Sequence, residues 1–143
     1  MISNLKSLIM DRCYESEYSI TPQRMLVIDT MVSQNKPISA YDLKHHLEFL
    51  GKKLNIATIY RILDFWCDLN LVHRLSSINK FIFCANPTEQ HTHIINCCQK
   101  CEITIESCHK KMGIDISRGM EALGLKLANG SHLEVPVLCS LCG

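Results

Sequence analysis

The sequence lacks long hydrophobic runs, a surplus of charge of one sign and any repeated or low-complexity segment. Its longest apolar runs, such as residues 81–85, are far too short to span a bilayer. Asp11 and Arg12 interrupt the brief stretch at residues 7–10, which argues against a signal peptide. With 47% hydrophobic and 20% charged residues, the chain has the composition of a globular protein. We therefore expect a soluble, cytoplasmic protein with no membrane partner, built as one domain or two small ones.

Cysteine and histidine are abundant, with nine and seven residues among 143. The odd number of cysteines and the reducing cytoplasm argue against a disulfide framework. Six of the cysteines and four of the histidines lie beyond residue 90. Residues 85–90 have the composition of a linker, with a proline and polar side chains. We therefore predict a domain at residues 1–84, a hinge at 85–90 and a metal-binding domain at 91–143.

The first domain contains signals for three helices followed by a hairpin. Typical helix starts occur at Thr21-Pro22, at Ser39 with Asp42, and at Asn55. Pro37 and Gly51 end the first two helices, and the third extends to about Leu69. Strand-like runs at residues 71–76 and 81–84 flank a turn. This order predicts a winged helix-turn-helix and, with the second domain, an α+β protein.

The third helix has one apolar face and one polar face. The polar face is typical of a solvent-exposed surface, and it also suits insertion into a DNA major groove. In the second interpretation Arg61 donates two hydrogen bonds to guanine, and Tyr60 contacts a phosphate or a thymine methyl group. Because the chain has a net charge of only +1, a monomer would bind DNA weakly, and we expect a dimer.

Two Cys-x-x-Cys pairs lie in the second domain. Four thiolates suit a closed, tetrahedral structural zinc site, which these pairs supply as Cys98, Cys101, Cys139 and Cys142. The long separation between the pairs predicts a strand and a helix between them, the helix at residues 110–123. Buried, inert cysteines are the alternative. A thioredoxin-like redox role is less expected, since neither pair begins a helix in a βαβ unit.

Further candidate metal ligands are scattered around the hinge. A mixed His, Cys and Glu set favours zinc over harder ions. Periodicity does not choose among the candidates, which are His73, Cys84, His91, His93, Cys97, Glu106, Cys108, His109 and His132.

Several motifs together resemble the ferric uptake regulator superfamily, and most closely its zinc uptake regulator branch. They are Thr-Pro-Gln-Arg at residues 21–24, the segment 38–43, Ala-Thr-Ile-Tyr-Arg from residue 57, His-Thr-His at 91–93 and both Cys-x-x-Cys pairs. The resemblance covers residues 21–142. It implies a winged-helix DNA-binding domain, an α/β dimerisation domain, and a zinc-loaded homodimer that binds palindromic operator DNA and represses zinc-uptake genes. It also implies no enzymatic activity and no small organic substrate.

The resemblance implies two zinc ions per subunit and roles for particular residues. The four cysteines of the two pairs match the structural zinc ligands. The regulatory ligands are expected at His73, Cys84, His91 and Glu106, and the DNA contacts at Tyr41, Tyr60 and Arg61. A thiolate at Cys84 suits zinc, whereas iron-sensing relatives carry a carboxylate there.

Among the positions that depart from the pattern, three leave alternatives open. His93 stands where some relatives place a ligand and competes with His91 for that role. Cys97 is a further thiol next to the first pair, and His132 lies near a third site of some relatives. An iron- or peroxide-sensing regulator of the same superfamily is the alternative function. A zinc hydrolase would need an open coordination position, which four protein ligands leave unavailable.

Overall fold

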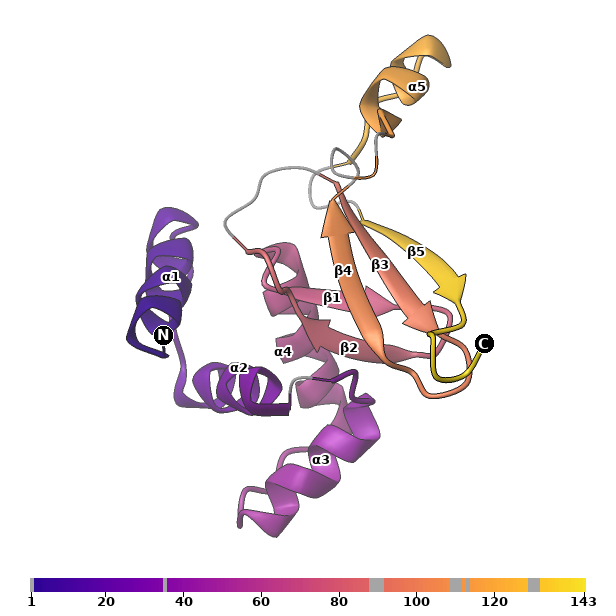
Figure 1. Ribbon diagram of the computed structural model, residues 1–143. Helices are drawn as coiled ribbons and strands as arrows, with labels where there is room; N and C mark the ends of the chain where they lie inside the picture. The colour runs from indigo at the N-terminus through magenta and orange to yellow at the C-terminus, as the bar shows by residue number, and fades with distance from the viewer. Residues whose placement is uncertain (1, 35, 88–91, 109–111, 113, 129–131) are drawn as a thin grey trace. The chain divides into compact units, whose positions relative to one another are not determined.

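The protein is described by a computed structural model over residues 2–34, 36–87, 92–108, 112, 114–128 and 132–143 (Figure 1). The chain forms two compact units, Met1–Phe83 and Cys84–Gly143. The first unit is mainly helical and the second contains a three-stranded sheet, so the predicted α+β class is confirmed. The expected hinge begins within the second unit, and its residues 88–90 lie outside the described part of the chain.

The described residues of the first unit form four helices and a hairpin. They are α1 (Ile2–Glu15), α2 (Pro22–Gln34), α3 (Ala40–Phe49), α4 (Ile56–Asp68), β1 (Val72–Leu75) and β2 (Lys80–Phe83). The two strands pair antiparallel, which confirms the predicted order of three helices and a wing for α2 to β2. The sequence pattern did not predict α1. This helix is anchored by the buried side chains of Ile9 and Cys13 and by Arg12, which donates to the Leu69 carbonyl at 2.8 Å.

Local signals position α3 and α4 as predicted. The Ser39 hydroxyl accepts the Asp42 N–H at 3.0 Å, and the Asn55 side chain accepts the Thr58 N–H at 2.8 Å. These bonds satisfy amide groups that a helix start leaves without a partner. Gly51 ends α3 with a φ of +79°, a left-handed conformation that favours glycine.

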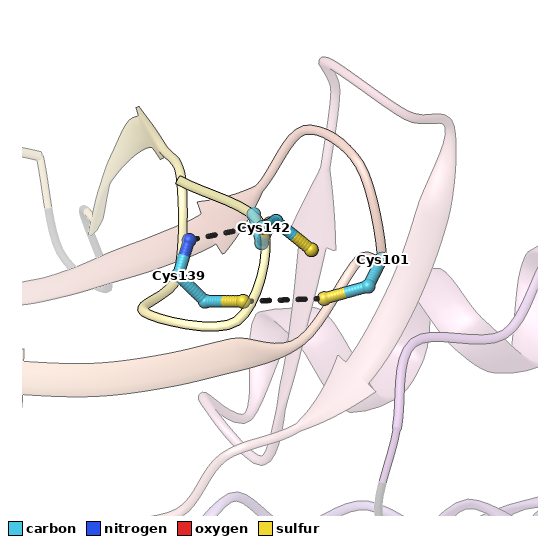
Figure 2. A group of neighbouring side chains, drawn as sticks. Cys101, Cys139 and Cys142 are labelled. Carbon is cyan, nitrogen blue, oxygen red and sulfur yellow. Dashed lines mark hydrogen bonds between the residues drawn. The ribbon is translucent and has the colours of Figure 1, made fainter.

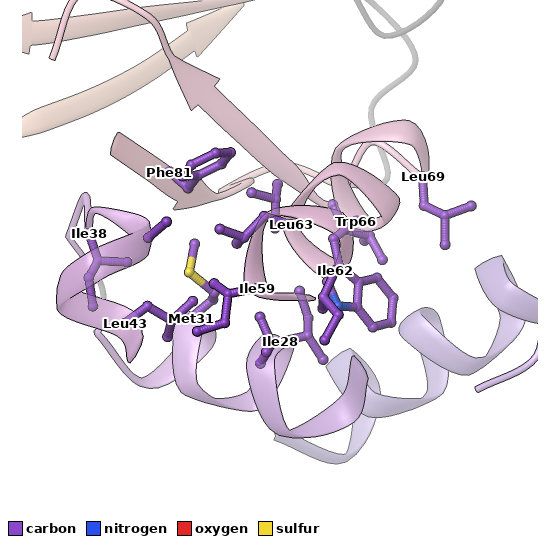
Figure 3. Close-up of a cluster of buried hydrophobic side chains, with 14 of the residues drawn as sticks. Ile28, Met31, Ile38, Leu43, Ile59, Ile62, Leu63, Trp66, Leu69 and Phe81 are labelled. Carbon is purple, nitrogen blue, oxygen red and sulfur yellow. The ribbon is translucent and has the colours of Figure 1, made fainter. Parts of the chain in front are cut away.

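The apolar face of α4 lies in the core of the first unit (Figure 3). Ile59, Leu63 and Trp66 are fully buried, and the Trp66 indole N–H donates to the Arg24 carbonyl at 3.1 Å. Burial of these side chains leaves the opposite face of α4, including Arg61, exposed. The packing thus leaves exposed the face that suits either solvent or a DNA major groove.

The second unit is built on a three-stranded sheet with the order β4-β3-β5. Its elements are β3 (His93–Cys98), β4 (Thr104–Cys108), α5 (Ile116–Ala122) and β5 (His132–Val137). The central strand β3 pairs antiparallel with β4 and parallel with β5. In the described residues, two strands and a helix therefore separate the Cys-x-x-Cys pairs, instead of the expected single strand and helix.

The predicted helix at residues 110–123 is too long. In the structure α5 begins at Ile116, because the Asp115 carboxylate accepts the Arg118 N–H at 3.0 Å and caps the helix there. Residues 109–111 and 113 lie outside the described part of the chain. The apolar spacing predicted the helix, but the capping residue sets its start.

None of the helices in the described ranges combines the length and the apolar character that crossing a membrane requires.

Candidate metal centres

The parallel pairing of β3 and β5 brings the two Cys-x-x-Cys pairs together. Cys98 is the last residue of β3, and Cys139 follows the end of β5 by two residues. Because parallel strands end at the same edge of a sheet, the turns after them are neighbours. One ligand atom from each of the four cysteines lies within 4.8 Å of all the others. Figure 2 shows the sulfur atoms of Cys101, Cys139 and Cys142 in this cluster.

The spacing of the four thiols fits a zinc ion. The sulfur atoms of Cys101 and Cys139 are 3.7 Å apart. A tetrahedral site with Zn–S bonds of about 2.3 Å places its sulfur atoms about 3.8 Å from one another. All nine cysteines are free thiols, so no disulfide competes with metal binding.

The protonation of the cluster is uneven. The pKa of Cys98 is lowered to about 6, because the backbone N–H groups of Cys101 and Cys139 donate hydrogen bonds to its sulfur. The pKa of Cys142 is raised to about 12, because its thiol shares hydrogen bonds with Cys139 and Cys101. A thiolate at Cys98 beside a protonated thiol at Cys142 is the arrangement expected where a cation takes the place of protons.

A second group of ligand atoms lies at the other end of β3, within the second unit. His93 is the first residue of β3, Glu106 lies on β4, and Cys84 is the first residue after β2. The Cys84 sulfur lies 3.5 Å from His93 Nδ1 and donates to Glu106 Oε1 at 3.3 Å. His93 Nδ1 also contacts Glu106 Oε1. Sulfur, imidazole and carboxylate together form a donor set that zinc accepts.

Strand register explains why His93 and Glu106 meet. His93 pairs with Cys108 across the β3–β4 ladder, and Glu106 lies two residues from Cys108 on the same strand. Since side chains alternate between the faces of a strand, His93 and Glu106 lie on one face of the sheet. Cys84 and His93 are buried there.

The other predicted ligands include a buried histidine on β1 and two histidines outside the described residues. His73 lies on β1, where it is buried and pairs with Ile82. His91 and His109 lie outside the described residues. Cys108 is the last residue of β4 and belongs to neither group of ligand atoms found in the described part of the chain.

Cys97 and His132 also belong to neither group among the residues that the structure describes. Cys97 precedes Cys98 on β3, so alternation directs its side chain to the opposite face of the sheet, toward Thr104. His132 pairs with His93 across the sheet, and its imidazole lies 3.9 Å from Glu134.

The predicted DNA contacts all lie on α3 and α4. Tyr41 is 58% exposed on α3, and Arg61 is exposed on α4. Tyr60 is half-buried, with its ring edge-on to Phe81 of β2 at 6.2 Å between centroids. Its aromatic body thus packs against the wing.

One hydrogen bond of Glu106, in the group with Cys84 and His93, could not be predicted from the sequence. The Ala85 backbone N–H donates to Glu106 Oε2 at 2.8 Å. A backbone amide carries no residue-specific pattern, so only the folded structure identifies this partner.

A sequence profile described as the ferric uptake regulator family matches residues 15–131. This chain belongs to the ferric uptake regulator family. The family member from Escherichia coli K12 called zinc uptake regulation protein is 32% identical over 134 residues, which cover 91% of this chain and 76% of that protein. The ferric uptake regulation protein of Haemophilus influenzae is 33% identical over 84 residues, 57% of this chain and 56% of that protein.

Two solved structures are similar to this chain over nearly its whole length. A zinc uptake regulator complexed with zinc and DNA aligns with a TM-score of 0.82 and 29% identity, over 97% of this chain and 93% of that chain. The crystal structure of holo XcZur aligns with a TM-score of 0.76 and 28% identity, over 96% of each chain.

Proposed function

We propose that this ferric uptake regulator family protein is a zinc-responsive transcriptional repressor. In this proposal a zinc-loaded homodimer in the cytoplasm binds operator DNA of two-fold symmetry and represses zinc-uptake genes. Each subunit holds two zinc ions, one structural and one regulatory. The observation that carries the proposal is the contact of the Cys84 thiol with His93 and Glu106. A thiolate in this group favours zinc over harder cations.

His73 is the fourth regulatory ligand in this proposal. It pairs with Ile82 in the wing, and Cys84 follows Ile82 by two residues. Side chains two residues apart in an extended chain point to the same side, so this register favours His73 as a partner of Cys84. For the third ligand, the contacts of His93 favour it over His91.

The four clustered cysteines serve a structural role in this proposal. Bound zinc supplies folding energy to a small domain with a limited core. The 3.7 Å spacing of Cys101 and Cys139 supports this role. Because four protein ligands close the site, it leaves no position for a substrate.

The exposed side of the sheet supports a homodimer. Strand register places the side chains of Ile105, Leu133 and Val135 on the face of the sheet opposite His93. These three side chains are 60%, 41% and 36% exposed. Apolar side chains that gather on one face of a sheet are typical of a protein interface. The second copy of the chain is the partner we propose for this face.

DNA recognition is assigned to α3 and α4. Arg61 and Tyr41 are the proposed base contacts, and Tyr60 contacts the DNA backbone. In a homodimer two copies of α4 enter successive major grooves, which requires an operator with two-fold symmetry. The regulatory ligands come from both sides of the boundary between Phe83 and Cys84. Zinc binding by all of them selects the arrangement of the two units that binds DNA.

The deciding experiment is a gel shift with Cys84→Ser at buffered free zinc. The probe is a DNA fragment selected from a random pool by the zinc-loaded wild-type protein. We expect the variant to remain a folded dimer that retains structural zinc but no longer binds the probe. Cys97→Ser is the matched control, because Cys97 is also buried but belongs to neither ligand group in the described residues. Binding by Cys84→Ser equal to that of the wild type refutes the proposal.

A metal series separates zinc sensing from the iron- or peroxide-sensing alternative. We expect DNA binding with Zn²⁺ at lower free concentration than with Fe²⁺ or Mn²⁺, and no loss of binding after peroxide treatment of the zinc-loaded dimer. Preferential activation by iron, or loss of binding through oxidation at the regulatory ligands, favours the alternative.

A further inference from the structure

The two carboxylate oxygens of Glu106 contact different parts of the chain. Oε1 accepts the Cys84 thiol at 3.3 Å and contacts His93 Nδ1. Oε2 accepts the Ala85 backbone N–H at 2.8 Å. The Glu106 side chain is only 6% exposed, so both oxygens act in a largely desolvated environment. Hydrogen bonds from an N–H group to a carboxylate are strongest under these conditions.

Two of the residues that Glu106 contacts, Cys84 and Ala85, are adjacent in the chain. Cys84 and Ala85 directly follow Phe83, which is the last residue of β2. One carboxylate therefore restrains a side chain and the adjacent backbone amide at once. The Ala85 side chain is exposed and offers no buried surface to hold this segment. The hydrogen bond from the Ala85 N–H to Glu106 thus restrains the backbone next to Cys84.

We propose that Glu106 is a positioning residue as well as a ligand of the regulatory site. Through Oε2 it holds the Ala85 amide, and this bond orients the Cys84 thiol toward the metal position before metal binds. The inference rests on the proposed function, since it assigns the metal position to regulatory zinc. Preorganisation of a ligand by a hydrogen bond outside the coordination sphere raises metal affinity.

The first test measures amide hydrogen exchange at Ala85 in metal-free protein. Glu106→Ala removes the acceptor, and exchange at Ala85 is expected to rise about tenfold. Glu106→Gln keeps a carbonyl oxygen that accepts the same N–H, so exchange stays near the wild-type rate. The Gln99 amide, which donates to the Val137 carbonyl at 2.9 Å, is the internal reference. Unchanged exchange in Glu106→Ala overturns the inference.

The second test measures zinc affinity after removal of the donor instead of the acceptor. Ala85→Pro lacks the backbone N–H, and Ala85→Ser retains it. With all ligands intact, Ala85→Pro is expected to bind the regulatory zinc about tenfold more weakly, while Ala85→Ser stays within about twofold of the wild type. Competition with a chelator of known affinity gives these values. A purely structural role predicts a lower unfolding midpoint without a change in zinc affinity, and that result also overturns the inference.

The two tests distinguish this inference from the proposed function. If the wild-type protein binds zinc only at the four clustered cysteines, the proposed function fails. If the wild type binds a second zinc ion and Ala85→Pro binds it with equal affinity, only the role of the Glu106–Ala85 bond is wrong. Retention of zinc by the four cysteines in Ala85→Pro shows that the second unit is folded.

Discussion

Replacement of His93 by glutamine tests the regulatory site directly. His93 is 7% exposed, and its Nδ1 atom contacts both Cys84 and Glu106. Loss of a residue that only supports a ligand lowers metal affinity by about 10- to 100-fold. Removal of a buried ligand that water cannot readily replace should reach at least the upper value. We therefore expect regulatory zinc affinity to fall by about 100-fold or more, which corresponds to about 2.7 kcal/mol.

The assay is chelator competition on protein that already holds zinc at the four cysteines, followed by DNA binding at matched free zinc. His132→Gln is the matched control, because His132 pairs with His93 in the same row of the sheet. Within the described residues it belongs to neither ligand group, so the control should keep wild-type zinc affinity. His91→Gln tests the other histidine that the sequence offers.

Two results would refute this reasoning. One is zinc affinity in His93→Gln within about threefold of the wild type, since a ligand cannot be removed at so small a cost. The other is a full loss of regulatory zinc in His91→Gln with His93 intact. That outcome would assign the site to His91 and make His93 a buried neighbour.

Further predictions concern stability, DNA binding and proton release. Asn55→Ala removes the cap of α4 and should lower the free energy of unfolding by about 1 kcal/mol in urea titrations; an unchanged midpoint would contradict this. Arg12→Gln removes the 2.8 Å bond to the Leu69 carbonyl and should cost about 1 kcal/mol, with faster amide exchange in α1; equal exchange would argue against the anchoring of this helix. Arg61→Ala should weaken binding to the selected DNA by about 1–3 kcal/mol and relax base preference, as measured by titration across variant sequences; unchanged affinity would remove it from the interface. The lowered pKa of Cys98, about 6, means that its thiol is ionised above that pH in metal-free protein. Zinc uptake by the four cysteines should therefore release about one proton fewer at about pH 7.5 than at about pH 5, and equal release at both values would contradict the shift.

The sequence predicted those features of the fold that depend on local interactions. The starts of α3 and α4 follow from Ser39 and Asn55, whose side chains bond to amides three residues away. The apolar face of α4 follows from periodicity alone. Helix α1 was not predicted, because its sequence carries no strong local pattern. Its position depends on tertiary contacts of Ile9 and Arg12.

The candidate metal sites depended on longer-range information. Spacing identified the two Cys-x-x-Cys pairs, but their meeting requires the parallel pairing of β5 with β3. Cys97 and Cys98 are equivalent thiols in the sequence, and only strand alternation separates their side chains.

The two histidines at residues 91 and 93 illustrate the limit most clearly. Their spacing of two residues is the period of a strand, so periodicity cannot choose between them. The sequence by itself determined the secondary-structure signals, the family motifs and the set of possible ligands, because these depend on residue types and short spacings. The tertiary structure alone brought His93 to Cys84 and Glu106, because strand register and backbone hydrogen bonds join residues that are distant in the chain.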